Sequence, residues 1–143
     1  MTEVIGIDHI YIAVSDLLRA EAFYDRVLQD VLGFRKNSFT LGDDPHVQYF
    51  NRHFGYVLRP ARRPGPHSSE APGLHHFCLR VASIEDVQQV AAQLRALGID
   101  ATPARHFPEY APDYWACFLA DPDGIRLEVT NYRQERRDRH DHW

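Results

Sequence analysis

Two histidines and one glutamate, far apart along the chain, are the residues best suited by type and position to bind a metal ion: His9, His76 and Glu128. His9 and His76 each open a stretch with the pattern His-x-x-x-x-Val. Neutral imidazoles and a carboxylate bind a divalent cation from one side and leave positions open for water or substrate. Such an ion lowers the pKa of a bound water or polarises a bound oxygen. A single strand histidine is more often structural, so the prediction depends on all three residues.

Alternation along the strands that carry these residues places all three on faces that helices do not cover. The apolar residues on the opposite faces are Ile10, Ile12 and Val14, then Phe77, Leu79 and Val81, then Ile125, Leu127 and Val129. If the strands form one curved sheet, His9, His76 and Glu128 can converge in its hollow. The same alternation directs His75 away from the site, although a shift of one residue would exchange it with His76.

Apolar repeats and turn residues divide the chain into two similar halves. The first half predicts a strand over 7–14, a helix from about Leu17 to Leu28 or slightly beyond, and strands near 34–40, 46–51 and 54–59. The second predicts a strand over 74–81, a helix over 84–97 after a capping box at Ser83, extended chain near 104–107 and 115–120, a tight turn over 121–124, and a strand over 125–131.

The predicted organisation is a first βαβββ module over about 5–60, a proline-rich linker over about 60–73, a second βαβββ module over about 74–132, and a charged tail over 133–143. We expect the tail to fray, because almost all of its residues are charged.

The composition is that of an ordinary globular protein, with 44% hydrophobic and 25% charged residues among 143. A net charge of −4 leaves no basic footprint, so nucleic acid is not an expected partner. No apolar run is long enough for a membrane span, and the first residues lack the pattern of a signal peptide. Two cysteines do not make a disulfide framework, so we expect a cytoplasmic protein with reduced thiols.

The chain resembles the vicinal oxygen chelate superfamily, which includes glyoxalase I, bleomycin-resistance proteins and type I extradiol dioxygenases. The segments that carry the resemblance are 7–17, 22–24, 32–34, 73–81 and 121–129, and it covers about residues 5–132. It implies an α+β fold in which two βαβββ modules form a cupped, mixed eight-stranded sheet. It also implies one divalent metal ion (Fe, Zn, Mn, Ni or Co) held by His9, His76 and Glu128, which chelates two oxygens of a small-molecule substrate, and a homodimer.

Departures from the family's patterns affect the choice of reaction. The glyoxalase and epimerase branches use a fourth ligand, and aligning Gly55 with Gly124 puts Arg59 there, which cannot ligate. Arg59 would suit a substrate carboxylate or phosphate, or be structural. The extradiol dioxygenases place a tyrosine where this chain has Phe118. His106 and Tyr110 remain candidates for catalysis, with ordinary packing as the competing interpretation.

Two classes of function follow from these observations. The first is a metal-dependent enzyme, with glyoxalase-like lyase or isomerase chemistry preferred over extradiol-type ring cleavage because of the missing tyrosine. The second is a metal-free protein that binds a drug or metabolite, as bleomycin-resistance proteins do. In that case Tyr49, Tyr114 and Trp115 would stack on the ligand.

Overall fold

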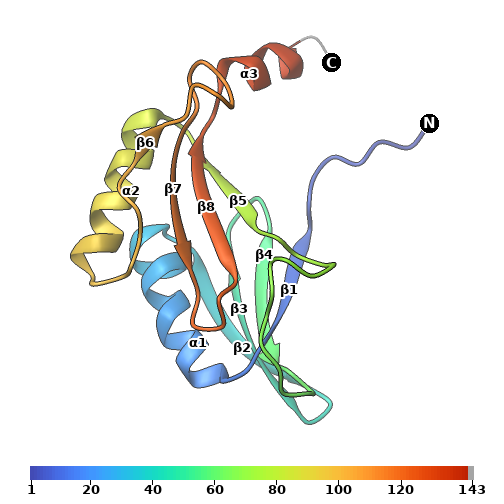
Figure 1. Cartoon of the computed structure of the whole chain (residues 1–143). Helices are drawn as coiled ribbons and strands as arrows, with labels where there is room; N and C mark the ends of the chain where they lie inside the picture. The colour runs from blue at the N-terminus through green and yellow to red at the C-terminus, as the bar shows by residue number, and fades with distance from the viewer. Residues whose placement is uncertain (142–143) are drawn as a thin grey trace. The chain divides into compact units, whose positions relative to one another are not determined.

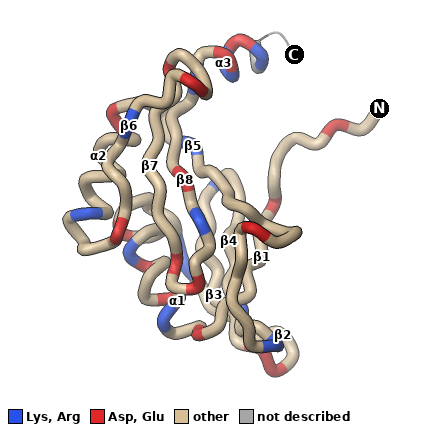
Figure 2. The backbone as a smooth tube through the Cα atoms, in the orientation of Figure 1, with Lys and Arg blue, Asp and Glu red and all other residues tan. Residues whose placement is uncertain are grey.

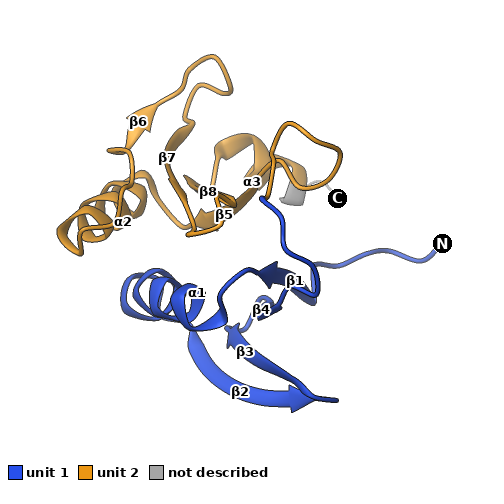
Figure 3. Cartoon of the chain, turned by 60° about the horizontal axis from the view of Figure 1, so that its bottom comes forward, with its two compact units in different colours: residues 1–66 blue, residues 67–143 orange. Residues whose placement is uncertain are grey.

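The structure is a computed structural model that describes residues 1–141, and it divides into two compact units, residues 1–66 and residues 67–143 (Figure 3). The boundary lies within the predicted proline-rich linker. The first unit contains β1 (His9–Val14), α1 (Leu17–Tyr24), η1 (Asp25–Val31), β2 (Arg35–Leu41), β3 (Asp44–Phe50) and β4 (Gly55–Pro60). Its sheet has the order β1-β4-β3-β2, in which β1 and β4 are parallel and the other pairs are antiparallel.

The second unit repeats this topology. It contains β5 (Phe77–Val81), α2 (Ile84–Ala96), β6 (Arg105–His106), β7 (Trp115–Ala120), β8 (Arg126–Asn131) and α3 (Gln134–Asp141) (Figure 1). The sheet order is β5-β8-β7-β6, again with the first pair parallel. The prediction of two βαβββ modules is therefore confirmed, and each module forms a four-stranded mixed sheet.

In the first unit, the helix after β1 is shorter than predicted and changes type. Asp16 caps α1 by accepting a hydrogen bond from the Arg19 N–H at 3.1 Å. After Tyr24 the chain continues as the π-helix η1, whose wider turns were not expected from the apolar spacing. The side chain of Tyr24 is fully buried and its hydroxyl lies 2.8 Å from that of Tyr56, which joins α1 to the sheet.

In the second unit, local capping and turn chemistry define the elements as the sequence predicts. Ser83 and Asp86 form a reciprocal capping box at the start of α2, and Gly98 adopts φ +76° after its end. Asp121 accepts hydrogen bonds from the N–H groups of Asp123 and Ile125, both at 2.9 Å, and so closes the turn before β8. The buried side of α2 contacts β7 and β8.

Two predictions that affect the candidate site are wrong. The strand expected over 74–81 begins only at Phe77, so His75 and His76 precede it. The charged tail is helical in α3, where basic and acidic residues alternate (Figure 2). The carboxylate of Asp113 accepts a hydrogen bond from the Gln134 N–H at 2.9 Å, and local residue spacing gives no signal for this contact with a distant loop.

No helix within residues 1–141 is both long and apolar enough to cross a membrane.

Candidate functional site

The second unit contains a cavity of about 480 Å³ that opens on the face of its sheet away from α2. Its lining combines imidazoles, a carboxylate, a guanidinium and four aromatic rings. The lining residues are His75, His76, Phe107, Tyr110, Tyr114, Phe118, Arg126 and Glu128. A volume of this size accommodates a small organic molecule.

A histidine and a buried glutamate form the polar part of this cavity. His76 Nε2 lies 3.3 Å from Glu128 Oε2, and the Glu128 side chain is 6% exposed whereas that of His76 is 43% exposed. Glu128 is held in the middle of β8, between β5 and β7, with Cys78 and Phe118 as its partners in register. A carboxylate buried this deeply needs polar partners, because burial without them is costly.

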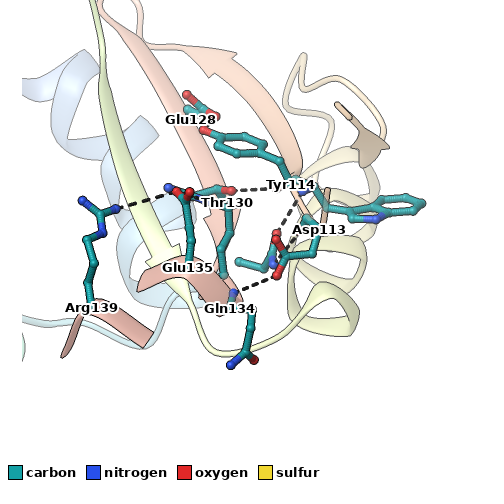
Figure 4. A network of polar contacts seen from close by, with 10 residues as sticks. Asp113, Tyr114, Glu128, Thr130, Gln134, Glu135 and Arg139 are labelled. Carbon is teal, nitrogen blue, oxygen red and sulfur yellow. Dashed lines mark hydrogen bonds and ion pairs between the residues drawn. The ribbon is translucent and has the colours of Figure 1, made fainter. Parts of the chain in front are cut away.

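Tyr114 supplies a second contact to the same carboxylate, which residue spacing does not predict. The Tyr114 hydroxyl donates a hydrogen bond to Glu128 Oε1 at 2.5 Å (Figure 4). Burial, and then the hydrogen bond to Glu128, raise the pKa of Tyr114 well above its usual range. The phenol therefore keeps its proton at neutral pH and acts as a hydrogen-bond donor.

The loop between β6 and β7 positions Tyr114. The Phe107 N–H donates to the Tyr114 carbonyl at 2.8 Å, and the Tyr114 N–H donates to the Ala111 carbonyl at 3.1 Å. The Arg133 guanidinium lies 4.6 Å from the centre of the Tyr114 ring. The ring is thus fixed by its own loop and by the segment that follows β8.

Cys78 is a further neighbour of Glu128 and is not among the predicted site residues. Although the residue as a whole is exposed, desolvation of its thiol, followed by the negative charge of Glu128, raises the pKa of Cys78 to about 12. The thiol is therefore neutral at physiological pH and a poor nucleophile. Alternation along β5 could have identified Cys78, because it lies on the face opposite Phe77, Leu79 and Val81.

His75 also lines the cavity, contrary to the prediction that it points away. His75 Nδ1 lies 2.8 Å from His76 Nδ1, so one ring donates a hydrogen bond to the other. Because β5 begins at Phe77, strict alternation does not apply to these two residues. Both imidazoles are therefore available at the cavity.

Aromatic rings form the remaining wall. The rings of Phe107 and Tyr110 are stacked with centroids 5.3 Å apart, and Phe118 meets Phe107 edge-on at 5.7 Å. Two other candidates from this region do not line the cavity. His106 stacks on Trp115 at 5.5 Å and donates from Nε2 to the Pro112 carbonyl at 2.7 Å. This pair serves to order the loop.

The remaining candidates belong to the first unit, and each is described there by its own contacts. His9 is half-exposed, and its Nδ1 lies 2.7 Å from Asp8 Oδ2, an arrangement that leaves Nε2 available. Arg59 forms an ion pair with Asp44. Tyr49 is completely buried, and its hydroxyl donates to Asp25 at 2.7 Å, so its ring belongs to the interior of this unit.

The strand registers also correct the predicted equivalence between the two halves. His9 pairs with Gly55 across β1 and β4, whereas Cys78 pairs with Glu128 across β5 and β8. If His9 is equivalent to His76, the position equivalent to Glu128 is Val57 and not Arg59. Valine has no atom that can bind a metal. The position of the fourth ligand therefore has no donor because it is a valine, and not because it is an arginine.

The donors at the cavity fit a divalent cation in kind. An imidazole and a carboxylate lie side by side, and both are ligands that Fe, Mn, Zn, Ni and Co accept. Within the described part of the second unit, no three His, Cys, Asp or Glu side chains surround a common point. His76 and Glu128 are thus a two-residue set, which a third donor would complete.

Each unit is thus a βαβββ module, and the second has an imidazole–carboxylate pair in a cavity. The sequence model of the Glyoxalase/Bleomycin resistance protein/Dioxygenase superfamily matches residues 6–129, and the chain belongs to this superfamily.

A curated relative is the biphenyl-2,3-diol 1,2-dioxygenase of Metapseudomonas furukawaii, which is 31% identical over 130 residues. The match covers 86% of this chain and 39% of the relative, so the chain spans about two fifths of that protein's length. Among solved structures, a glyoxylase/bleomycin resistance protein/dioxygenase domain from Frankia sp. EAN1pec has a TM-score of 0.75 at 22% identity, covering 92% of this chain and 100% of that one.

A variant of the fosfomycin resistance protein FosX from Listeria monocytogenes, solved with Mn(II) and 1S,2S-dihydroxypropylphosphonic acid, has a TM-score of 0.69 at 16% identity. The match covers 94% of this chain and 98% of that one. At these identities the two solved structures support the fold alone.

Proposed function

We propose that this protein is a metal-dependent enzyme that binds a small molecule with two adjacent oxygen atoms in the cavity of its second unit. The observation that carries the proposal is the contact between His76 Nε2 and the buried Glu128 carboxylate at 3.3 Å on the cavity wall. A buried carboxylate beside an imidazole, facing a cavity lined with aromatic rings, suits a cation and an organic ligand together.

The proposed ligands are His76, Glu128 and His9. The contact between His9 Nδ1 and Asp8 supports this role, because metal-binding histidines commonly donate their second ring N–H to a carboxylate. His9 comes from the other unit of the same chain or from a second copy. When bound, a divalent ion would stabilise negative charge that develops on the substrate oxygens.

The protein's own groups would position the substrate and hold protons. Tyr114 keeps its phenol proton and donates a hydrogen bond to Glu128 Oε1, so the phenol would orient the carboxylate, and its free lone pair would accept a hydrogen bond from a substrate hydroxyl. Phe107, Tyr110 and Phe118 would stack on an apolar part of the ligand and exclude water from it.

Proton-transfer chemistry of the lyase or isomerase type is the preferred reaction. Phe118 lines the cavity at the position where the extradiol pattern has a tyrosine, and a phenyl ring has no proton to give. Ring cleavage of an aromatic diol is the second candidate, and the 31% identity to a biphenyl-2,3-diol dioxygenase favours it. Oxygen uptake with biphenyl-2,3-diol under Fe(II) would support ring cleavage and exclude the preferred class.

Metal content tests the proposal directly. Untagged wild-type protein should bind about one divalent ion per chain, and His76→Ala and Glu128→Gln should each weaken that binding by about tenfold or more. His53→Ala and Glu70→Gln are matched controls, because both residues are exposed in loops outside the cavity. Wild-type metal content far below one per chain, unrestored by added Fe, Mn, Zn, Ni or Co, would contradict the enzyme and favour a metal-free binding protein.

The expected homodimer and cytoplasmic location belong to the same proposal. Gel filtration with light scattering measures the first, and fractionation of cells that express the protein measures the second.

A further inference from the structure

The cavity of the second unit contains one guanidinium, that of Arg126 at the start of β8. Three other arginines of this unit have carboxylate partners: Arg105 with Glu109 at 3.8 Å, Arg133 with Glu135 at 3.6 Å, and Arg139 with Glu135 at 3.7 Å. Arg80 and Arg137 instead each lie 4.3 Å from the centre of the Tyr132 ring. Among residues 1–139, Arg126 has no carboxylate partner, so its charge is available to a ligand.

We propose that Arg126 binds an anionic group of the substrate and makes the cavity selective for small aromatic molecules that carry a carboxylate. This inference rests on the proposed function, because it takes the same cavity as the substrate site. It adds the chemical class of the substrate, which neither the fold nor the His76–Glu128 contact defines.

The geometry of β8 separates the two ends of such a molecule. Arg126 and Glu128 are two residues apart on one strand, so their side chains leave from the same face at points about 7 Å apart. Both side chains line the cavity. A ligand with adjacent oxygens at the His76–Glu128 end would therefore reach Arg126 with a group about one benzene ring away.

The charges of the cavity define which end of the ligand is anionic. The Glu128 carboxylate repels a substrate carboxylate, whereas the Arg126 guanidinium attracts it and offers a planar pair of donors. The aromatic rings of Phe107, Tyr110 and Phe118 complete a wall for the ring between the two ends. A neutral analogue of the same shape retains the stacking contacts but loses the ion pair.

Binding of a charged and a neutral probe tests this assignment. The probes are 3,4-dihydroxyphenylacetate and its neutral amide, and titration calorimetry measures both dissociation constants with and without Mn(II). In the wild-type protein the carboxylate should bind about tenfold more tightly than the amide, with a preference that falls as salt is added. Arg126→Gln should abolish this preference, and Arg126→Lys should retain part of it.

The control variant is Arg95→Gln, which removes an exposed arginine of α2 and should leave the preference unchanged. Equal binding of both probes to the wild-type protein, a preference that survives Arg126→Gln, or no binding of either probe at millimolar concentration would overturn the inference. Failure of the proposed function is distinguishable, because the preference without Mn(II) does not require a metal. If the protein binds no metal but still prefers the carboxylate probe through Arg126, the proposed metal-dependent activity is wrong and the anion site is supported.

Discussion

Glu128 is the residue on which the candidate site depends most. Its side chain is almost completely buried, and two different groups, the Tyr114 phenol and the His76 imidazole, contact its two oxygens. Buried carboxylates are stable only when hydrogen bonds or charges compensate for the lost water. The contact with Tyr114 therefore contributes to stability as well as to the proposed chemistry.

Replacing Tyr114 with phenylalanine should lower the free energy of unfolding. The variant removes a donor from a buried carboxylate, so we expect a loss of about 1–3 kcal/mol. Urea denaturation of the metal-free protein measures it. Tyr110→Phe is the matched control, because Tyr110 is exposed, and its effect should stay within about 0.5 kcal/mol. Equal losses in the two variants would show that the hydrogen bond to Glu128 does not stabilise the fold.

At the scale of elements, the loop before β7 links the cavity to α3. Asp113 accepts a hydrogen bond from the first residue of α3, and its neighbour Tyr114 contacts Glu128 (Figure 4). The Asp113 carbonyl also accepts a hydrogen bond from the Asn131 side chain at 2.9 Å. One short segment therefore supports both the terminal helix and the tyrosine of the site.

Asp113→Ala should weaken α3 specifically. It removes the carboxylate that caps the helix, a change that costs about 1 kcal/mol at a typical N-terminus. Amide hydrogen exchange should accelerate over residues 134–139 and stay unchanged in α2. Asp100→Ala, at an exposed position, is the control. Unchanged exchange in the Asp113 variant would mean that α3 is stabilised by other contacts.

Elements whose signals are local could be predicted from the sequence, and elements that depend on distant contacts could not. The capping box at Ser83 and the turn closed by Asp121 require only neighbouring residues, and both were predicted. The helix α3 has no apolar periodicity, and its cap comes from Asp113, some twenty residues earlier in the chain. The sequence therefore predicted a frayed tail there.

Within the site, too, features with local signals could be predicted and features that depend on distant contacts could not. Alternation along β8 correctly separated Glu128 from the apolar face, because Leu127 and Val129 are buried beneath α2. The contact between Tyr114 and Glu128 depends on how a loop folds back over β8, so residue spacing contains no signal for it. The predicted direction of the His75 side chain is wrong because β5 begins only at Phe77. Periodicity does not define where hydrogen bonding between strands begins.

On the scale of the whole molecule, the two units are copies of one topology with different sites. Both have a parallel pair of strands at the same place in the sheet, and both bury aromatic or aliphatic side chains beneath one helix. In the second unit the imidazole–carboxylate contact involves a buried glutamate on a cavity wall, whereas the His9–Asp8 contact of the first unit involves an exposed carboxylate. His9 of the first unit is the proposed third metal ligand. This prediction also raises the question of whether His9 comes from the same chain or from a second copy.

His9→Ala should reduce metal affinity about as strongly as His76→Ala, and calorimetric titration with Mn(II) measures both. A mixture of His9→Ala and Glu128→Gln proteins then identifies the chain that supplies the third ligand. Restored binding in the mixture means that His9 of one copy serves Glu128 of another, and unrestored binding means that each chain uses its own. Wild-type affinity in the His9 variant alone would remove His9 from the site.

The protonation state of Cys78 affects how the protein responds to oxidants. Peroxides attack the thiolate form of cysteine, and a pKa of about 12 leaves almost none of it at neutral pH. Cys78 is an exposed residue, so its protonated state protects a sulfur atom close to Glu128 where burial does not. We therefore expect the Cys78 thiol to react more slowly with hydrogen peroxide than an acidic cysteine would at the same place.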